Sequence, residues 1–369
     1  RWDGTAWEYT SGSDSAGSMR MMNLTPDNRL LVPISSCYPQ ELRIYDANNG
    51  TPTTIPMPND APEPQVAWAL SEADDIMVLT ESDDAYFWNG TDWRTESTGL
   101  GLVQYSSFND ILGFSLTDVW AIGESDNTPV MARFNGTGWV RDAEAEALFD
   151  ETPFVMVATD ADNIYTAASS GALLHWDGSS WDLALPDLFT WPSDFGRCVA
   201  TSPASCTGTG YGITPFMAMA PDGILYATAA TGTYTVLDGS DGNCPAGEFR
   251  CVIEFENDIL STEVLRFDGS DWSVITLPEL HDGWTTYVLG LFAPASDYLY
   301  ASLVAGDVTT SDGEFIANVY VYDGTGWTPL TEDLPTDYFP FLIEGQGIGD
   351  FWSMGIEGSG LYHYQSCVD

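Results

Sequence analysis

The sequence predicts an all-β fold, a seven-bladed β-propeller with four antiparallel strands in each blade. Two short phrases that recur along the 369 residues, together with the spacing of their copies, support this prediction. Repeats of roughly 40 to 50 residues are typical of propellers, in which each blade buries its apolar faces against its two neighbours. Residues 1–369 are therefore expected to form one propeller domain, with insertions at about 186–212 and 231–262.

The first phrase is an aromatic residue, Asp or Asn, Gly, two further residues and Trp. Its six copies lie at residues 2–7, 88–93, 134–139, 176–181, 267–272 and 322–327. Asn-Gly and Asp-Gly supply the positive φ angles of a tight hairpin. A weaker copy at 45–50 retains the turn residues but lacks the final Trp. We expect this phrase to join the third and fourth strands of each blade and its tryptophans to be structural.

The second phrase is an apolar strand introduced by Asp or Asn, clearest at 118–123 and 350–355. Its other copies are centred on Leu31, Met77, Tyr165, Tyr226 and Tyr300. Small, β-branched and aromatic residues in such a run are typical of a strand buried on both faces, here the second of each blade. The first strands are then predicted just before these copies, at 19–24, 66–70, 107–114, 154–159, 216–220, 286–292 and 339–344.

The last blade lacks a fourth strand of its own, because the sequence ends soon after the third strand predicted at 361–364. We expect residues 6–10 to supply it, so that residues 1–10 complete the C-terminal blade. Such a closure mixes the two ends of the chain in one sheet and removes an open sheet edge.

The blade formed by Asp-Val-Trp-Ala-Ile-Gly at 118–123 and Arg-Phe-Asn-Gly-Thr-Gly-Trp at 133–139 resembles the repeats of secreted bacterial β-propeller proteins, common in large-genome Gram-negative predators and their relatives. The resemblance is one of architecture over nearly the whole chain. It implies a propeller fold and export. The turn is also close to the Asp-box of sialidases, but its Gly is displaced by one position, and the paired glycine of kelch blades is absent.

The charge is extreme, with 10 arginines, no lysine, 55 acidic residues and a net charge of −45. Such a surface repels phosphate backbones and excludes nucleic acid as a partner. No window reaches the roughly 18 consecutive apolar residues of a membrane helix, so no transmembrane segment is predicted. No signal peptide precedes the first repeat, which indicates a mature or trimmed form. We expect a secreted protein that acts outside the cell or at its surface.

Six cysteines without a Cys-x-x-Cys motif favour disulfides in an oxidising compartment. The simplest pairs are Cys198 with Cys206 and Cys244 with Cys251, although crossed pairing between them remains open. Cys37 and Cys367 are then left to pair with each other, unless the C-terminal tail folds back across the edge of the propeller.

Three long segments, at 186–212, 231–261 and 305–313, interrupt the repeat. All three belong to the face that carries the second-to-third-strand and blade-to-blade connections, which we call the long-loop face; the opposite face, with the tight hairpins, is the turn face. Long loops on a rigid scaffold commonly carry binding sites. The ligand-binding candidates in or beside these segments are Phe189, Trp191, Arg197, Tyr211, Tyr234, Phe249, Arg250 and Trp284. The same aromatics equally suit small cores beneath the loops.

Calcium is the one cofactor that the sequence suggests, and none is required. Oxygen side chains separated by glycines at 238–243 resemble a calcium-binding turn, although their order departs from that of an EF-hand loop. The candidate ligands are Asp238, Ser240, Asp241, Asn243 and Glu248. A plain acidic hairpin is the alternative. With only His175, His281 and His363 in the chain, imidazole-rich metal sites are not expected.

No nucleophile elbow, phosphate loop or zinc-protease motif is present, and no catalytic residue is predicted. The favoured function is a secreted, non-enzymatic module that recognises carbohydrate or protein at the cell surface through the long-loop face of blades four to six. A structural subunit of an extracellular assembly and a glycan-active hydrolase are the alternatives.

Overall fold

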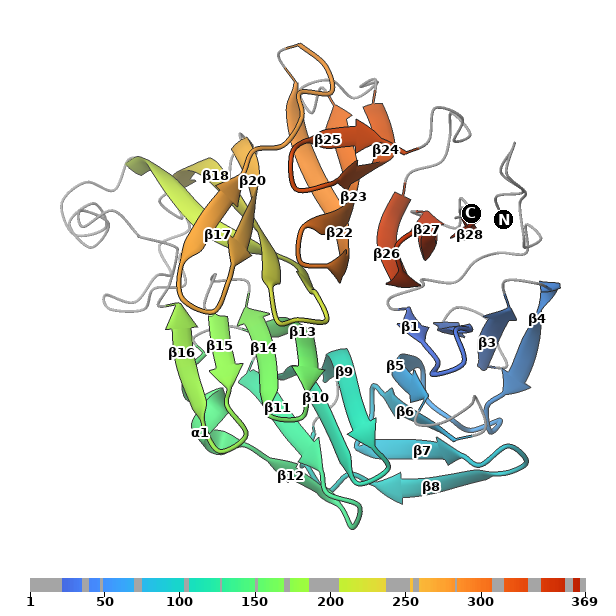
Figure 1. Cartoon of the computed structure of the whole chain (residues 1–369). Coiled ribbons are helices and arrows are strands. Elements are labelled where there is room, and N and C mark those ends of the chain that lie inside the picture. The colour runs from blue at the N-terminus through green and yellow to red at the C-terminus, as the bar shows by residue number, and fades with distance from the viewer. Residues whose placement is uncertain are drawn as a thin grey trace.

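The computed structural model describes residues 22–34, 40–46, 49–69, 75–102, 106–126, 128–149, 152–168, 173–185, 206–236, 253–254, 259–282, 284–306, 315–330, 340–355 and 361–365. The chain is a seven-bladed β-propeller, in which antiparallel sheets follow one another around a common axis (Figure 1). This confirms the predicted fold class.

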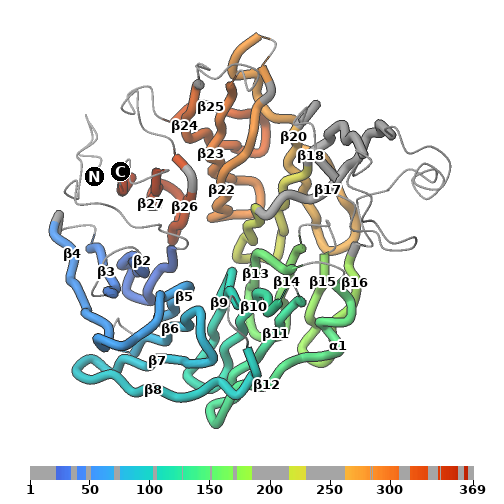
Figure 2. Tube along the Cα trace, turned by 180° about the vertical axis from the view of Figure 1, so that it is seen from behind, coloured from blue at the N-terminus to red at the C-terminus, as the bar shows by residue number. Residues whose placement is uncertain are grey.

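The blades follow the chain in order, and the first strand of each lies nearest the axis (Figure 2). The first strands are β1 (Asn23–Leu24), β5 (Pro64–Ala69), β9 (Ser107–Ser115), β13 (Pro153–Asp160), β17 (Cys206–Met219), β22 (Thr285–Ala295) and β26 (Pro340–Gly347). The second strands are β2 (Leu30–Ile34), β6 (Ile76–Thr80), β10 (Asp118–Ser125), β14 (Asn163–Ala168), β18 (Leu225–Val236), β23 (Tyr298–Gly306) and β27 (Asp350–Gly355).

The outer strands complete the sheets. The third strands are β3 (Glu41–Asp46), β7 (Asp84–Trp88), β11 (Thr128–Phe134), β15 (Leu173–Trp176), β20 (Ile259–Phe267), β24 (Phe315–Tyr322) and β28 (Leu361–Gln365). The fourth strands are β4 (Asn49–Pro56), β8 (Trp93–Ser97), β12 (Trp139–Arg141), β16 (Trp181–Leu185), β21 (Trp272–Ile275) and β25 (Trp327–Pro329). A short strand, β19 (Ile253–Glu254), pairs with β18 in blade five. Blade seven has three strands in the described part of the chain, and the segment predicted for its fourth strand, residues 6–10, lies outside that part.

Both sequence phrases lie where they were predicted. Every copy of the apolar phrase falls in a second strand, and each turn within the described ranges joins a third strand to a fourth. Second strands are buried on both faces because their side chains point alternately to the two neighbouring blades. In β10, Val119 and Ala121 pack with blade two, whereas Trp120 and Ile122 pack with blade four.

Within the described residues, the core is divided into seven hydrophobic clusters, one at each junction between neighbouring blades. The seventh joins Met22 and Leu30 of blade one to Trp352 and Met354 of blade seven, which closes the ring.

The turns share a second feature that the sequence pattern did not reveal. In blade four, Oδ1 of Asp177 accepts hydrogen bonds from N–H of Ser179 (2.9 Å), the Ser179 hydroxyl (2.8 Å) and N–H of Ser180 (2.9 Å). The Ser or Thr two positions after the Asp or Asn is therefore part of the motif. The side-chain hydrogen bond from Ser179, together with the backbone ones, lowers the pKa of Asp177 to about 2. Gly136 of blade three has φ +85°, and a Cβ there would lie 2.5 Å from Thr117.

The turn tryptophans link neighbouring blades. Nε1 of Trp93 in blade two donates to Pro56 O in blade one (2.8 Å), and Nε1 of Trp327 in blade six donates to Thr276 O in blade five (2.9 Å). These contacts agree with the structural role predicted for the repeat tryptophans.

Blade five departs from the prediction. Its first strand starts at Cys206 rather than near residue 216, and its second strand extends to Val236. Residues 206–212 and 230–236, most of which were predicted as loop, pair with each other from Cys206↔Val236 to Gly212↔Ala230. Thr, Tyr and Val are frequent in these segments and favour extended structure, and the prediction gave this too little weight.

The one helix in the described part of the chain, α1 (Ala143–Glu146), connects blade three to blade four. Within the same ranges, no helix has the length and hydrophobicity needed to cross a bilayer.

Candidate functional site

Most of the predicted site residues and cysteines lie outside the described ranges. They include five ligand-binding candidates (Phe189, Trp191, Arg197, Phe249, Arg250), every candidate calcium ligand (Asp238, Ser240, Asp241, Asn243, Glu248) and five cysteines (Cys37, Cys198, Cys244, Cys251, Cys367). The proposed disulfides and the calcium turn therefore remain predictions. Within the described residues, no group of three or more His, Cys, Asp or Glu side chains is placed to hold a metal ion.

Three predicted residues lie in the blade-five hairpin that extends β17 and β18. Tyr211 pairs with Thr231, Tyr234 pairs with Gly208, and Cys206 starts the hairpin opposite Val236. The hairpin extends toward the long-loop face, because the first strand of a blade begins there and the second strand ends there. Among the described strands, β17 pairs with β18 alone, so its other edge has no strand partner.

Trp284, the remaining ligand-binding candidate, lies on the connection from blade five to blade six. Its ring stacks on His281, with ring centroids 4.1 Å apart and an interplanar angle of 29°. The backbone N–H of Trp284 donates to His281 O (3.1 Å), which fixes the pair locally. The imidazole is exposed and the indole is partly exposed, so the stacked pair presents an aromatic surface on the long-loop face.

The first strands provide a second region, around the axis. Their inner edges are not paired in a sheet, and side chains from the preceding blade bind some of the free backbone groups. These links are Asn23 Nδ2 to Ala67 O (2.7 Å), Phe108 N–H to Gln65 Oε1 (2.6 Å), Asn109 Nδ2 to Pro153 O (2.9 Å) and Met156 N–H to Asp110 Oδ2 (2.6 Å). The last two hold a β-bulge in β13, at which Phe154 is 39% exposed.

Two carboxyl groups near the axis have strongly raised pKa values. Burial raises the pKa of Asp110 in β9 to about 7, although N–H of Met156 and Ile111 donate to it. Burial also raises the pKa of Glu344 in β26 to about 8, with a further contribution from the negative charge of Asp110. The seven first strands contain no arginine, lysine or histidine that could neutralise this pair. Shifts of this kind are frequent at functional sites.

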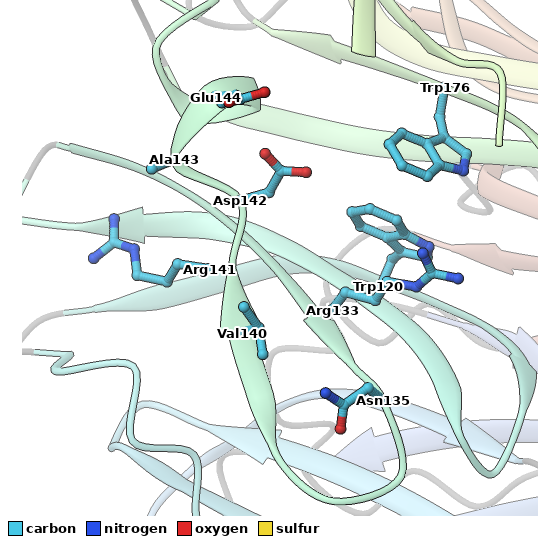
Figure 3. A pocket seen from close by; sticks show the side chains of 9 residues that line it. All are labelled: Trp120, Arg133, Asn135, Val140, Arg141, Asp142, Ala143, Glu144 and Trp176. Carbon is cyan, nitrogen blue, oxygen red and sulfur yellow. The ribbon is translucent and has the colours of Figure 1, made fainter. Parts of the chain in front are cut away.

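A third region is a pocket of about 420 Å³ on the outer rim, between blades three and four (Figure 3). Trp120 (β10) and Trp176 (β15) form one side, with ring centroids 5.3 Å apart. Val140 of β12 and the segment that starts α1 form the other side. Val140 is 55% exposed, whereas Trp120 is 1% exposed.

Arg133 of β11 covers the two tryptophans at the pocket. Its guanidinium carbon lies 5.0 Å from the centroid of the Trp120 ring and 5.8 Å from that of Trp176. Nε and Nη2 donate to the two oxygens of Asp118, at 2.7 and 2.9 Å. This ion pair neutralises Arg133 and fixes its orientation.

Arg133 is one of four basic residues at the same repeat position, directly before the aromatic residue of the turn, and the fourth, Arg266, pairs with Asp297. Each of the other three packs on an aromatic ring of the second strand and bonds to the polar residue that begins that strand. The three sets are Arg133 with Trp120 and Asp118, His175 with Tyr165 and Asn163, and His363 with Trp352 and Asp350. Two of the three histidines are thus cross-strand links within blades.

Sequence reasoning missed the axial carboxyls and the rim pocket. A signal existed for the first, because Asp110 is followed by the apolar pair Ile111–Leu112 and Glu344 directly follows the apolar run Phe341–Ile343. In a sequence with 55 acidic residues, a single carboxylate did not indicate a functional site. The pocket had no local signal, because its residues come from two blades.

Comparison with known proteins identifies the architecture and no family. No protein-family model matches the sequence, and no curated protein matches it significantly. Among solved structures, the chain is similar to YCF48 bound to D1 peptide, with a TM-score of 0.59 and 11% identity over 99% of this chain and 98% of that one.

Two further solved structures share the architecture. One, from the mitotic checkpoint complex, has a TM-score of 0.50 and 8% identity over 99% of this chain and 89% of that one. The other is the extracellular domain of the hybrid two-component system BT4673 from B. thetaiotaomicron, with a TM-score of 0.54 and 11% identity. That likeness covers 98% of this chain and 40% of the other. At such identities these likenesses concern the fold alone.

Proposed function

We propose that this propeller is a secreted, non-enzymatic binding module that recognises a protein segment through the long-loop face of blades four to six. The observation that carries the proposal is the hairpin of blade five. In blade four, β13 and β14 have 8 and 6 residues, whereas β17 and β18 in blade five have 14 and 12. The added length lies on the long-loop face, where the repeat requires none.

The hairpin has the backbone geometry for binding an extended peptide. Along residues 206–212, β17 pairs with β18 on one side and has no strand partner on the other among the strands described. A partner segment that adds a strand to such an edge gains main-chain hydrogen bonds, and nearby side chains provide specificity. Trp284 and His281 supply an aromatic surface on the adjoining connection. Aromatic side chains are frequent anchors in protein interfaces.

The comparisons support a peptide ligand more than a glycan, since the structure of YCF48 contains a bound peptide. Export is supported by the resemblance of the blades to secreted bacterial propellers. Calcium enters the proposal only through the turn at 238–243, so binding is to be measured with and without Ca²⁺.

A displayed library of random peptides, screened against the full chain beside a glycan array, tests the proposal. We expect enrichment of extended peptides whose affinity falls at least tenfold in Tyr211→Thr and in Trp284→Ala. Val274→Thr is the matched control, because Val274 is 54% exposed on the fourth strand of the same blade, away from the hairpin. The proposal fails if no peptide is enriched, or if these variants and the control bind equally. Glycan binding lost in the same variants would favour the carbohydrate alternative.

A further inference from the structure

The rim pocket between blades three and four is a second site, on the outer edge of the propeller rather than on the long-loop face. Its volume of about 420 Å³ falls in the range of small-ligand pockets, roughly 300–1,000 Å³. The segment that starts α1 forms one wall. A ligand of this pocket must match the polar groups that line it.

The pocket contains a hydrogen-bond donor without a partner among the described residues. The Asn135 carboxamide uses Oδ1 for its own turn, accepting from Thr137 N–H (3.0 Å) and Gly138 N–H (3.2 Å), which leaves Nδ2 to donate to a ligand. The indole Nε1–H of Trp120 is buried beneath Arg133 and does not open into the pocket, so Trp120 contributes only to its wall.

The segment that starts α1 supplies acceptors at the pocket. Oδ1 of Asp142 accepts from Ala145 N–H (3.0 Å) as the helix cap, and its second oxygen is free. Glu144 follows on the exposed first turn of the helix. In Figure 3 the side chain of Arg141 points away from the two tryptophans, and it forms an ion pair with Glu146 at 2.8 Å. Neither carboxylate of the pocket is therefore neutralised by that arginine.

These groups exclude simple ions as good ligands. An anion finds no free positive charge, because Asp118 already neutralises Arg133 and the chain carries a net charge of −45. A simple cation would satisfy Asp142 and Glu144 but leave the Asn135 donor unmatched. The ligand must both donate and accept, and it must cover the apolar side chain of Val140.

Hydroxyl groups both donate and accept, and a pyranose ring carries them around an apolar C–H face. We propose that the rim pocket binds a neutral sugar residue, whose hydroxyls bridge the donor Asn135 to the acceptors Asp142 and Glu144 and whose C–H face packs on Val140. The site is independent of the long-loop face.

The turn repeat supplies a matched pair of variants. Asn135→Asp keeps the oxygen that accepts the turn hydrogen bonds, as Asp177 does in blade four, but removes the Nδ2 donor from the pocket. Asn89→Asp is the same change in the equivalent turn of blade two, remote from the pocket. Val140→Tyr fills the pocket from an exposed position, with Val274→Tyr as its control.

Saturation-transfer NMR titrations of the full chain with glucose, galactose, mannose, N-acetylglucosamine and their disaccharides test the proposal. We expect at least one of these sugars to bind, and its affinity to fall tenfold or more in Asn135→Asp and Val140→Tyr but not in Asn89→Asp or Val274→Tyr. No binding by any sugar, or equal binding by all variants, would overturn the proposal. Parallel titrations with glycine, L-leucine, spermidine and citrate complete the test, because loss of one of these ligands in the pocket variants, without sugar binding, would assign the pocket to another chemistry. The peptide-binding variants Tyr211→Thr and Trp284→Ala should bind the sugar normally, which separates the two sites.

Discussion

Asp177 on the turn face and Asp110 near the axis have the same side chain, and each carboxylate accepts hydrogen bonds from two backbone N–H groups. Their pKa values nevertheless move in opposite directions, to about 2 for Asp177 and about 7 for Asp110. Asp177 is exposed, so water stabilises its charge and the hydrogen bonds add to that. Asp110 is 9% exposed, and burial outweighs the same kind of hydrogen bond.

The two regions also differ in repetition. The turn carboxylate or carboxamide recurs in five described blades with one hydrogen-bond pattern, at Asn89, Asn135, Asp177, Asp268 and Asp323. Asp110 and Glu344 have no counterparts on the other first strands apart from Asp160 at the end of β13. Repetition therefore marks residues that build the blades. A residue that lowers the stability of the fold and is not repeated is a candidate for function.

The largest expected effect is at the axis, with Glu344→Gln. In the unfolded chain the pKa of this carboxyl is near its ordinary value of 4.5, and burial raises it to about 8 in the folded chain. The folded state therefore binds more protons between these pH values, and the stability of the wild type falls there as pH rises, by up to roughly 1.4 kcal/mol per pH unit. The variant should be a few kcal/mol more stable than the wild type at pH 9 and equal to it at pH 4.

Chemical denaturation across pH 4–9 measures this difference. Glu81→Gln, the same change at an exposed position, is the control and should not reproduce the gain in stability at pH 9. An unchanged profile in Glu344→Gln would mean that the axial carboxyl is solvated like one on the turn face.

On the turn face, the largest effect is expected from Gly136→Ala. The new Cβ would meet Thr117, and φ of +85° is unfavourable for alanine, so we expect a loss of about 1–3 kcal/mol. Gly138→Ala, in the same turn with open space around it, should be close to neutral. Urea denaturation compares the two variants, and equal stabilities would contradict the close approach between the turns.

A smaller loss, roughly 1 kcal/mol, is expected in Trp93→Phe, because the hydrogen bond to Pro56 O disappears. Trp139→Phe is its control, since Nε1 of Trp139 is buried without a partner among the described residues. Thermal unfolding should show the larger decrease for Trp93→Phe. The opposite order would show that the hydrogen bond between blades is not what makes the turn tryptophans stabilising.

The smallest effect is expected in Asp177→Asn, which keeps the accepting oxygen. The lowered pKa of Asp177 stabilises the fold above the ordinary value of 3.8, and this contribution is lost as pH falls through about 2. The variant should therefore have a slightly lower Tm at pH 7 and the wild-type Tm near pH 2. A difference that is constant with pH would show that the charge of this turn does not contribute.

The fold was predictable because its determinants are local and repeated. The turn phrase specifies a hairpin by itself, and six copies at similar spacing specify a ring of similar sheets. The extension of β17 and β18 was missed because no other blade has it, and the prediction relied on comparison between blades. The rim pocket was missed for another reason: Trp120, Asn135 and Trp176 are ordinary repeat residues, and only the packing of blade four beside blade three brings them to one cavity.

The cluster that joins blade one to blade seven has a consequence for the order of folding. Its contacts connect Met22 and Leu30 to Trp352 and Met354, whereas each of the other six clusters connects consecutive blades. Contacts between residues so distant in the chain are slow to form, because the intervening chain must first be ordered. We expect sheets one to six to assemble in sequence during synthesis, and the ring to close last, as a rate-limiting step that waits for the final blade.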